Sequence, residues 1–239
     1  MISAPKPENE RERLEALRAY ELLDTKPEAV FEAITRLAAA VFDTPIAMIS
    51  LIDEDRQWFK SQFGLGDTTS MGRDEAFCAH AILQTGIFEV ADASVDARFA
   101  DNPLVVGDPN IRFYAGIPLI EPGGAALGTL CVIDREPREL TPAQAENLEL
   151  LGKVVVGIIT MRIRRSEISA YRRSPSERRS AMRANLKRRS QLLAALTHSA
   201  ADLRASLGKE PAAISTLLRL SASDWVTEQL NSTAHESAG

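Results

Sequence analysis

The chain has 239 residues, of which 45% are hydrophobic and 26% charged, and its formal net charge is −5. This composition is that of a globular protein and excludes a disordered or collagenous chain. The most apolar helical run, residues 150–161, contains Lys153 and is shorter than the about 20 residues that cross a bilayer. The charged N-terminal segment is unlike a secretory signal. We therefore expect a cytoplasmic protein without a membrane span, whose two cysteines are free thiols.

Charge is unevenly distributed along the chain. Residues 1–161 hold 14 Lys and Arg against 26 Asp and Glu (−12), residues 162–189 hold 11 against 2 (+9), and residues 190–239 hold 3 against 5 (−2). This pattern predicts an acidic domain over residues 1–165, a basic linker helix over 166–189 and a small helical tail over 190–239.

Two helices are predicted at the start of the chain. Apolar residues recur at helical spacing from about residue 9 to residue 42. The pattern breaks at residues 24–27, where Pro27 and short polar residues favour a helix stop and a new start.

A block of strands follows. Residues 46–52 are apolar on both alternating faces and predict a central strand, and residues 57–64 complete a hairpin after the turn "DEDR". A loop over 66–75, a short helix over 76–86 and a third strand over 87–94 come next. Residues 95–110 are too rich in Asp, Asn, Pro and Gly for a regular element, and residues 112–120 and 126–137 predict two further strands around the turn "EPGG".

A long helix is predicted after Pro137, with Thr141 as N-cap and Pro142 in the first turn. Spacings of three and four residues define an apolar seam that could form a coiled coil: Leu148, Leu151, Val155, Ile158 and Met161. The fold class is therefore α+β, an antiparallel sheet flanked by helices, with a C-terminal helical extension.

Over residues 8–165 the chain resembles the GAF domains found at the N-terminus of many bacterial signalling proteins. The resemblance lies in the motifs "FEAITRLAAAVFDTPIAMISLIDEDRQWFKSQFGL", "FCAHAI", "VADASVDARFADNPLV", "IRFYAGIPL" and "LGTLCVIDREPREL". It implies a six-stranded antiparallel sheet with helices on one side and a ligand pocket, or its remnant, on the other. It also implies a homodimer formed through terminal helices, and a signal passed to a downstream signalling protein such as a histidine kinase of a two-component system, a cyclase or a transcriptional output. Such domains seldom do chemistry, so we expect no enzyme activity.

Some features depart from specialised members of the family. The Asn, Lys, Phe, Asp and Glu signature of nucleotide-binding members cannot be placed. Bilin-binding members carry Cys directly before His, whereas here Ala79 separates Cys78 from His80. Free methionine sulfoxide reductases need clustered cysteines, and Cys78 and Cys131 lie on separate predicted elements. The sequence therefore identifies no cofactor.

The candidate ligand-binding residues fall in or beside the loops that cover the sheet in GAF domains. They could form a pocket for a small anionic ligand, with guanidinium groups and aromatic rings as contacts. The alternative, which we favour, is that the arginines pair with Asp92 and Asp96 to fix a long irregular loop. Both interpretations make residues 77–82 a lid or wall over the sheet, with Phe77, Cys78 and Ile82 inward. The candidates are Trp58, Phe59, Arg73, Phe77, Cys78, His80, Asp92, Arg98, Asn102, Arg112 and Tyr114.

No catalytic or metal-binding residue is assigned. A zinc site needs three or four ligands at close spacing, which the sequence does not show. Cys78 could be mildly activated by Arg73 and His80, although a free cysteine more often fills a small buried space. Alternation in its strand makes Cys131 a core residue.

Three functional hypotheses follow. The leading one is a non-enzymatic sensory module that binds a small ligand or mediates dimerisation through its terminal helices. The second is a GAF-regulated nucleic-acid-binding transcriptional regulator, because residues 162–189 are strongly basic and the helices predicted over 201–220 loosely resemble a helix-turn-helix. The third is a thiol redox sensor that uses Cys78.

Overall fold

A computed structural model describes residues 1–161. Within them, six strands form one antiparallel sheet in the order β3-β2-β1-β6-β5-β4. The basic linker predicted over 166–189, the tail over 190–239 and the domain boundary at residue 165 lie outside the described residues. The strands are β1 (Ile46–Ile52), β2 (Arg56–Phe63), β3 (Ser70–Gly72), β4 (Phe88–Val90), β5 (Phe113–Ile120) and β6 (Ala126–Asp134).

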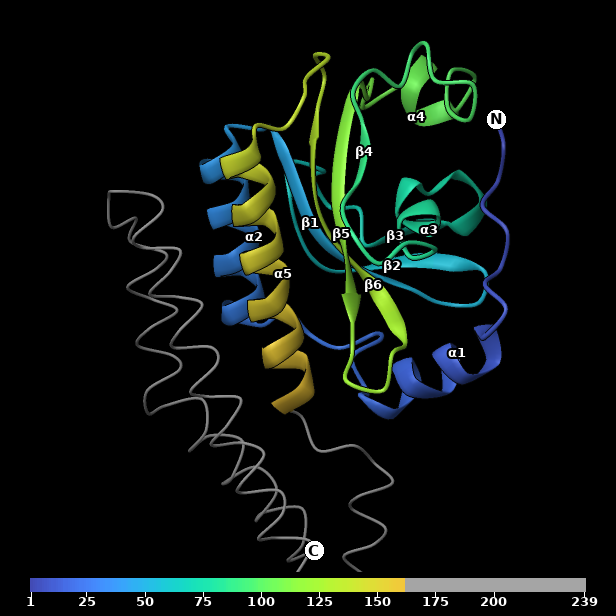
Figure 1. Ribbon diagram of the computed structural model, residues 1–239, viewed down its shortest axis with the longest axis vertical. Helices are drawn as coiled ribbons and strands as arrows, with labels where there is room; N and C mark the ends of the chain where they lie inside the picture. Colours follow the sequence, from blue (N-terminus) through green and yellow to red (C-terminus); the bar gives the residue numbers. More distant parts are fainter. Residues whose placement is uncertain (162–239) are drawn as a thin grey trace, which may run out of the picture.

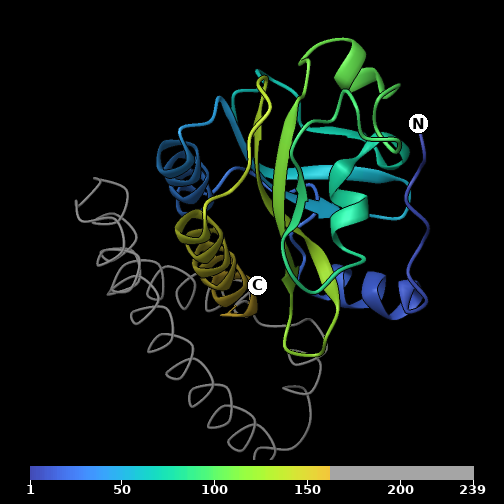
Figure 2. The same ribbon diagram turned by 45° about the horizontal axis from the view of Figure 1, so that its top comes forward.

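Helices cover the two faces of the sheet differently (Figure 1). The long helices α2 (Ala29–Phe42) and α5 (Pro142–Met161) pack side by side on one face, which we call the helix face. The short helices α3 (Phe77–Ala81) and α4 (Pro103–Val106) and their connecting loops cover the other, which we call the loop face; Figure 2 shows the same division. Helix α1 (Glu10–Ala19) lies across one end of the sheet. This arrangement confirms the predicted α+β class, and no helix within residues 1–161 is long and apolar enough to span a bilayer.

Alternation along the strands divides the interior into two apolar clusters. In β1, Ile49 and Leu51 join the cluster on the helix face, whereas Met48 and Ile52 join the cluster on the loop face. All seven residues of β1 are buried, and the strand lies between β2 and β6. The predicted central strand is thus confirmed, and the two-sided apolar pattern follows from cover on both faces.

Helix α5 begins as predicted. The backbone N–H of Gln144 donates to Thr141 Oγ1 at 3.2 Å, and the backbone N–H of Thr141 donates to Gln144 Oε1 at 3.0 Å. This reciprocal pair is a capping box, which satisfies amide groups that the first helical turn leaves free.

The apolar seam of α5 packs within the domain. Its residues lie in the helix-face cluster with residues of α2, β5 and β6, so a coiled coil formed by this seam would compete with the domain's own core. The side of α5 that is exposed carries Glu146, Glu149 and Lys153. The seam residues are Leu148, Leu151, Val155, Ile158 and Met161.

Two segments differ from the sequence-based expectation. The loop predicted over 66–75 contains β3, which pairs with β2 through Gln57 and Met71, followed by a 3-10 turn at Arg73–Glu75. The segment 95–110, predicted to be irregular, contains the four-residue α4, for which Asn102 is the N-cap. Elements of three or four residues are too short to show a periodic apolar pattern, and tertiary contacts define them.

Candidate functional site

An aromatic cluster fills the centre of the loop face. The ring of Phe77, at the start of α3, stacks on Phe99 with 4.0 Å between centroids and an interplanar angle of 11°, and on Tyr114 of β5 at 5.3 Å. Phe88 of β4 packs against Phe99 and Tyr114. These four rings are buried, so side chains occupy much of the region where the resemblance implied a ligand pocket.

Two thiols meet beneath this cluster. The Sγ atoms of Cys78, on α3, and Cys131, on β6, are 3.7 Å apart, and the hydroxyl of Tyr114 donates to Cys78 Sγ at 3.3 Å. The hydroxyls of Ser50 and Thr129 lie beside them and hydrogen-bond to each other at 3.1 Å. Five side chains from α3, β1, β5 and β6 thus form a buried cluster of sulfur and hydroxyl groups, which we call the dithiol cluster.

The dithiol cluster changes the pKa of its members. Burial raises the pKa of the Cys78 thiol, but hydrogen bonds from Cys131, Ser50, Thr129 and Tyr114 outweigh burial and lower it below the ordinary thiol value. Burial and the adjacent Cys78 raise the pKa of Cys131, because a second thiolate in the same enclosure would be repelled by the first. One proton therefore leaves the pair more easily than two.

Gly116 makes room for Tyr114 in this cluster. Gly116 lies two residues along β5 from Tyr114, on the same face, and pairs with Cys131 on β6. A Cβ atom at Gly116 would lie 2.3 Å from the hydroxyl oxygen of Tyr114. A side chain at position 116 would therefore displace the ring from its place beside Cys78.

Arg73 is held by the N-terminal helix. It is only 5% exposed and pairs with Glu10 of α1, and its Nη1 also donates to the carbonyl oxygen of Asp53 at 2.9 Å. The Glu10 carboxylate also accepts a hydrogen bond from a second guanidinium, that of Arg13, whose Nε lies 2.7 Å from Glu10 Oε2. Burial raises the pKa of Glu10, but the hydrogen bonds from Arg13 and Arg73 outweigh it and lower the pKa to about 2.

His80 and Arg98 face the N-terminal segment at the edge of the loop face. His80 Nε2 donates to the carbonyl oxygen of Ile2 at 3.0 Å, and the amide of Ile2 donates to the carbonyl oxygen of Arg98 at 3.0 Å. Burial lowers the pKa of His80, as does the neighbouring Arg98. The Arg98 guanidinium binds both oxygens of Asp96 and lies 4.9 Å from the centroid of Phe88.

The other polar candidates also have partners within the chain. We call residues 92–110, which connect β4 to β5 over the loop face, the crossover. Asn102 accepts from the amide of Leu104 at 2.9 Å and donates to the carbonyl oxygen of Glu75 at 3.0 Å. The second bond connects the crossover to the turn before α3. Arg112 donates to the carbonyl oxygens of Val105 and Ile111. Asp92 accepts from the amide and hydroxyl of Ser94 within one turn.

These contacts refine the predicted pairing of arginines and aspartates. Arg98 pairs with Asp96 as expected, whereas Arg73 pairs with Glu10 and Arg112 with backbone carbonyls. The favoured interpretation is therefore correct for Arg98 alone, because Arg73 is held by Glu10 of α1 and Arg112 by backbone carbonyl oxygens.

Trp58 does not belong with the other candidates. Its side chain lies in the cluster on the helix face, where the ring centroid is 5.9 Å from Lys60 Nζ. The side chain of the neighbouring Phe59 lies in the cluster on the loop face. Consecutive residues of a strand point to opposite faces, so one site on the loop face cannot include both.

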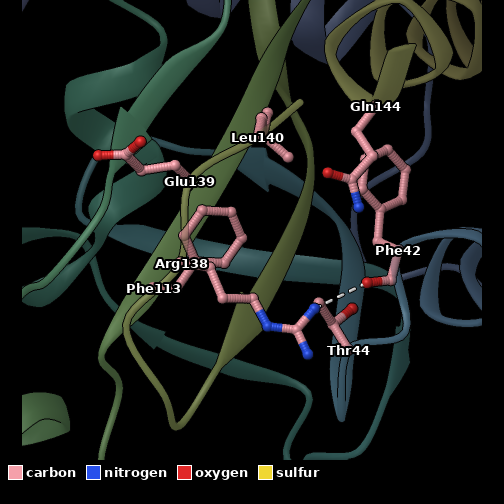
Figure 3. A pocket seen from close by; sticks show the side chains of 7 residues that line it. All are labelled: Phe42, Thr44, Phe113, Arg138, Glu139, Leu140 and Gln144. Atoms are coloured by element: carbon pink, nitrogen blue, oxygen red, sulfur yellow. Dashed lines mark hydrogen bonds between the residues drawn. The ribbon is translucent and has the colours of Figure 1, made fainter. Parts of the chain in front are cut away.

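A small pocket lies on the helix face and is lined by none of the candidates (Figure 3). Its volume is about 190 Å³, and Figure 3 shows Arg138 donating to the carbonyl oxygen of Phe42, at 2.9 Å. Arg138 also pairs with Asp134 at 2.7 Å, so its guanidinium is already engaged. The pocket is lined by Phe42, Thr44, Phe113, Arg138, Glu139, Leu140 and Gln144.

Sequence reasoning missed three contributors to the loop face. Glu10 was assigned only to a helix, Phe99 only to an irregular segment, and Cys131 only to the core. The available signal for the two thiols was that Cys78 was predicted to point inward and that alternation made Cys131 a core residue, which could have placed both in one cluster.

Comparison with known proteins identifies the family. The family described as GAF domain matches residues 26–162, more than half of the chain, and the chain belongs to this family. A Pseudomonas aeruginosa protein named cyclic di-GMP phosphodiesterase PA2567 is 48% identical over 160 residues. The match covers 66% of this chain but 27% of that protein, so the chain matches only a minor part of the relative's length.

Solved structures with similar folds include two further proteins. The GAF domain of a phosphoenolpyruvate-protein phosphotransferase from Acinetobacter is 19% identical with a TM-score of 0.48, covering 64% of this chain and 94% of that one. The free methionine-R-sulfoxide reductase of Neisseria meningitidis is 15% identical with a TM-score of 0.45, covering 68% of this chain and 95% of that one.

Proposed function

We propose that this GAF domain is a non-enzymatic sensory module that acts as a homodimer and passes a change on its loop face, through β5, to α5 and a downstream signalling protein. Membership in the GAF family supports a signalling role. The observation that carries the proposal is the position of β5 between the loop-face cluster and α5.

Strand β5 contacts both sides of the domain. Tyr114 points to the loop face, where it contacts Phe77 and Cys78, and Ile117 points to the helix face. A Cβ atom at Gly152 of α5 would lie 2.7 Å from Ile117 Cγ2, so helix and strand pack at the closest approach that glycine allows. Because packed interiors deform little, a shift of β5 caused at Tyr114 would move α5.

The absence of enzymatic activity is part of the proposal. The polar candidates Arg73, Arg98, Asn102 and Arg112 each make hydrogen bonds or ion pairs within the domain, which is the arrangement of a structural cover. The buried cysteines, at 1% and 0% exposure, are also poorly placed to bind and turn over a substrate larger than a peroxide.

The relative named as a cyclic di-GMP phosphodiesterase suggests the first assay. We infer that the shared 160 residues act as a regulatory part and that a cyclic-dinucleotide enzyme is an output partner. The purified full chain, incubated with cyclic di-GMP and Mg²⁺ or Mn²⁺, should release no hydrolysis product. Product formation by the purified chain that persists through successive purification steps would contradict the non-enzymatic assignment.

We also propose that the module binds a small polar ligand, and three buried polar atoms support this part of the proposal. Within the described residues, three buried side-chain atoms have no hydrogen-bond partner: Asp53 Oδ1, Gln57 Oε1 and Arg73 Nη2. The side chains of Gln57 and Arg73 are only 2% and 5% exposed. A donor and an acceptor left unsatisfied in the interior can bind a small polar ligand or water. Native mass spectrometry of gently purified protein should reveal a retained small molecule, and Gln57→Leu should abolish its retention.

Nucleic-acid binding is a second candidate function because residues 162–189 carry a net charge of +9. Binding to duplex DNA should then be measurable at low salt and should weaken steeply as salt rises, since each phosphate contact releases counterions. Absence of binding at low salt would remove this candidate.

A further inference from the structure

The two thiols of the loop face lie close enough to each other to react, and not only to fill space in the core. Cys78 Sγ and Cys131 Sγ are in contact at 3.7 Å, although their positions are 53 residues apart in the sequence. A disulfide bond is about 2.05 Å long, so the two sulfurs need to approach by about 1.7 Å. We infer that Cys78 and Cys131 form a redox-active dithiol, which a hydroperoxide such as hydrogen peroxide converts to an intramolecular disulfide.

The surroundings of the thiols support this reactivity. Three hydroxyl groups, from Tyr114, Ser50 and Thr129, lie at the pair, and Tyr114 donates directly to Cys78 Sγ at 3.3 Å. Cysteines that merely fill space in a core are surrounded by apolar side chains and are inert. Hydroxyl donors instead stabilise a thiolate, and the thiolate is the nucleophile in oxidation by peroxide.

The reaction balances with one equivalent of peroxide. The Cys78 sulfur attacks one peroxide oxygen, the O–O bond breaks, and the leaving hydroxide takes the Cys78 thiol proton to become water, which leaves Cys78 as a sulfenic acid. The Cys131 sulfur then attacks the Cys78 sulfur, the S–O bond breaks, and the departing hydroxide takes the Cys131 proton to become a second water. The two thiols lose two electrons in total, and the peroxide gains them.

Burial determines which reagents reach the pair. Cys78 is 1% exposed and Cys131 0% exposed, and the cover over them is the five-residue helix α3 with the aromatic ring of Phe77. Hydrogen peroxide is little larger than a water molecule, so a small local opening beside α3 is sufficient to admit it. We therefore expect a small hydroperoxide to react with the folded protein, and a bulky maleimide to label the thiols only after denaturation.

The disulfide would change the loop face without requiring the relay proposed above. It would join α3 covalently to β6 and close a long loop, which restricts the unfolded chain and raises the Tm by several degrees. In the disulfide, Cys78 Sγ can no longer be a thiolate, so it becomes a weaker acceptor for the Tyr114 hydroxyl. The Tyr114 ring, which stacks on Phe77, would therefore lose a hydrogen bond that holds it in place.

The test uses the reduced full chain treated with hydrogen peroxide and analysed by intact mass and by non-reducing peptide mapping. We expect a product at the covalent mass of one chain less two hydrogens, with the Cys78 peptide linked to the Cys131 peptide, and reversal by dithiothreitol. In Cys131→Ala, Cys78 should instead accumulate sulfenic acid that dimedone traps. Thiols that stay reduced in wild type, a sulfinic acid on one cysteine, or only disulfides between chains would overturn the inference.

A conservative variant tests the hydroxyl contribution without relying on cysteine replacements. Tyr114→Phe keeps the ring that packs on Phe77 and removes the donor to Cys78. The rate of disulfide formation should fall about tenfold, because less thiolate is present at neutral pH, while the circular dichroism spectrum stays unchanged. An equal rate in a folded Tyr114→Phe variant would contradict the role assigned to the hydroxyl group.

Discussion

Glu10 of α1 and Arg73 of the turn before α3 form an ion pair between side chains that are only 14% and 5% exposed. The same carboxylate binds Arg13, whose Nη1 reaches the carbonyl oxygen of Ala126 on β6 at 3.2 Å. One acidic group therefore fastens the N-terminal helix to the cover of the loop face and to the central sheet.

Glu10→Gln should destabilise the domain by about 3 kcal/mol, because it leaves two buried guanidinium groups without a compensating charge. Urea unfolding measures the change. Glu15→Gln on the same helix is the matched control: Glu15 is 68% exposed and lies 3.7 Å from the exposed Arg11, so its loss should cost less than about 0.5 kcal/mol. Equal losses of unfolding free energy from the two substitutions would show that the buried contacts of Glu10 with Arg13 and Arg73 stabilise the domain no more than an exposed ion pair does.

Acid should weaken the same contact. The pKa of Glu10 is lowered from 4.5 to about 2 in the folded domain, so its contribution to stability is present above about pH 5 and is lost as the pH falls toward 2. The full contribution is on the order of 3 kcal/mol. The difference in unfolding free energy between wild type and Glu10→Gln should therefore shrink between pH 6 and pH 3, and a constant difference would speak against the assignment.

Gly152→Ala should destabilise the domain although alanine favours helix by about 1 kcal/mol. The added methyl group would lie 2.7 Å from Ile117 Cγ2, and overpacking of this kind costs about 1–3 kcal/mol. The substitution should cost less in an Ile117→Ala background, as thermal unfolding can show. Gly86→Ala, where no atom lies within 4 Å of the added Cβ, should be close to neutral. A Gly152→Ala protein more stable than wild type would exclude the close contact between β5 and α5.

Asn102→Ala should loosen the crossover over the loop face. It removes the N-cap of α4 and the bond to the Glu75 carbonyl oxygen from a side chain that is 1% exposed, at a cost of about 1–3 kcal/mol. Limited proteolysis should cut faster within residues 92–110. Asp92→Ala, which affects only a local turn at Ser94, should leave the cleavage rate nearly unchanged; similar rates in both variants would mean that Asn102 does not hold the crossover.

The sequence predicted long elements well and short ones poorly. Residues 46–52 showed apolar residues on both faces and proved to be the buried strand β1, whereas the three residues of β3 carry no period that could reveal them. Thr141 was recognised as a cap because threonine is a preferred N-cap residue and Pro142 follows it in the first turn. The local sequence pattern was therefore sufficient to predict an element wherever the contacts that define it lie within a few residues in the chain.

The site needed long-range information. Strand periodicity could have separated Trp58 from Phe59, because adjacent residues face opposite sides, but the pairing of Arg73 with Glu10 depends on where α1 crosses the sheet. The contact between Cys78 and Cys131 likewise depends on the placement of α3 over β6. A single sequence indicates which residues point inward and does not indicate which of them meet.

The central claim is that the domain signals as a homodimer. Sedimentation equilibrium of the full chain at tens of micromolar tests it most directly, because the mass of one chain is 26.1 kDa. We expect a species of twice that mass, with self-association retained when both cysteines are reduced. A single species at the mass of one chain under these conditions would contradict the account.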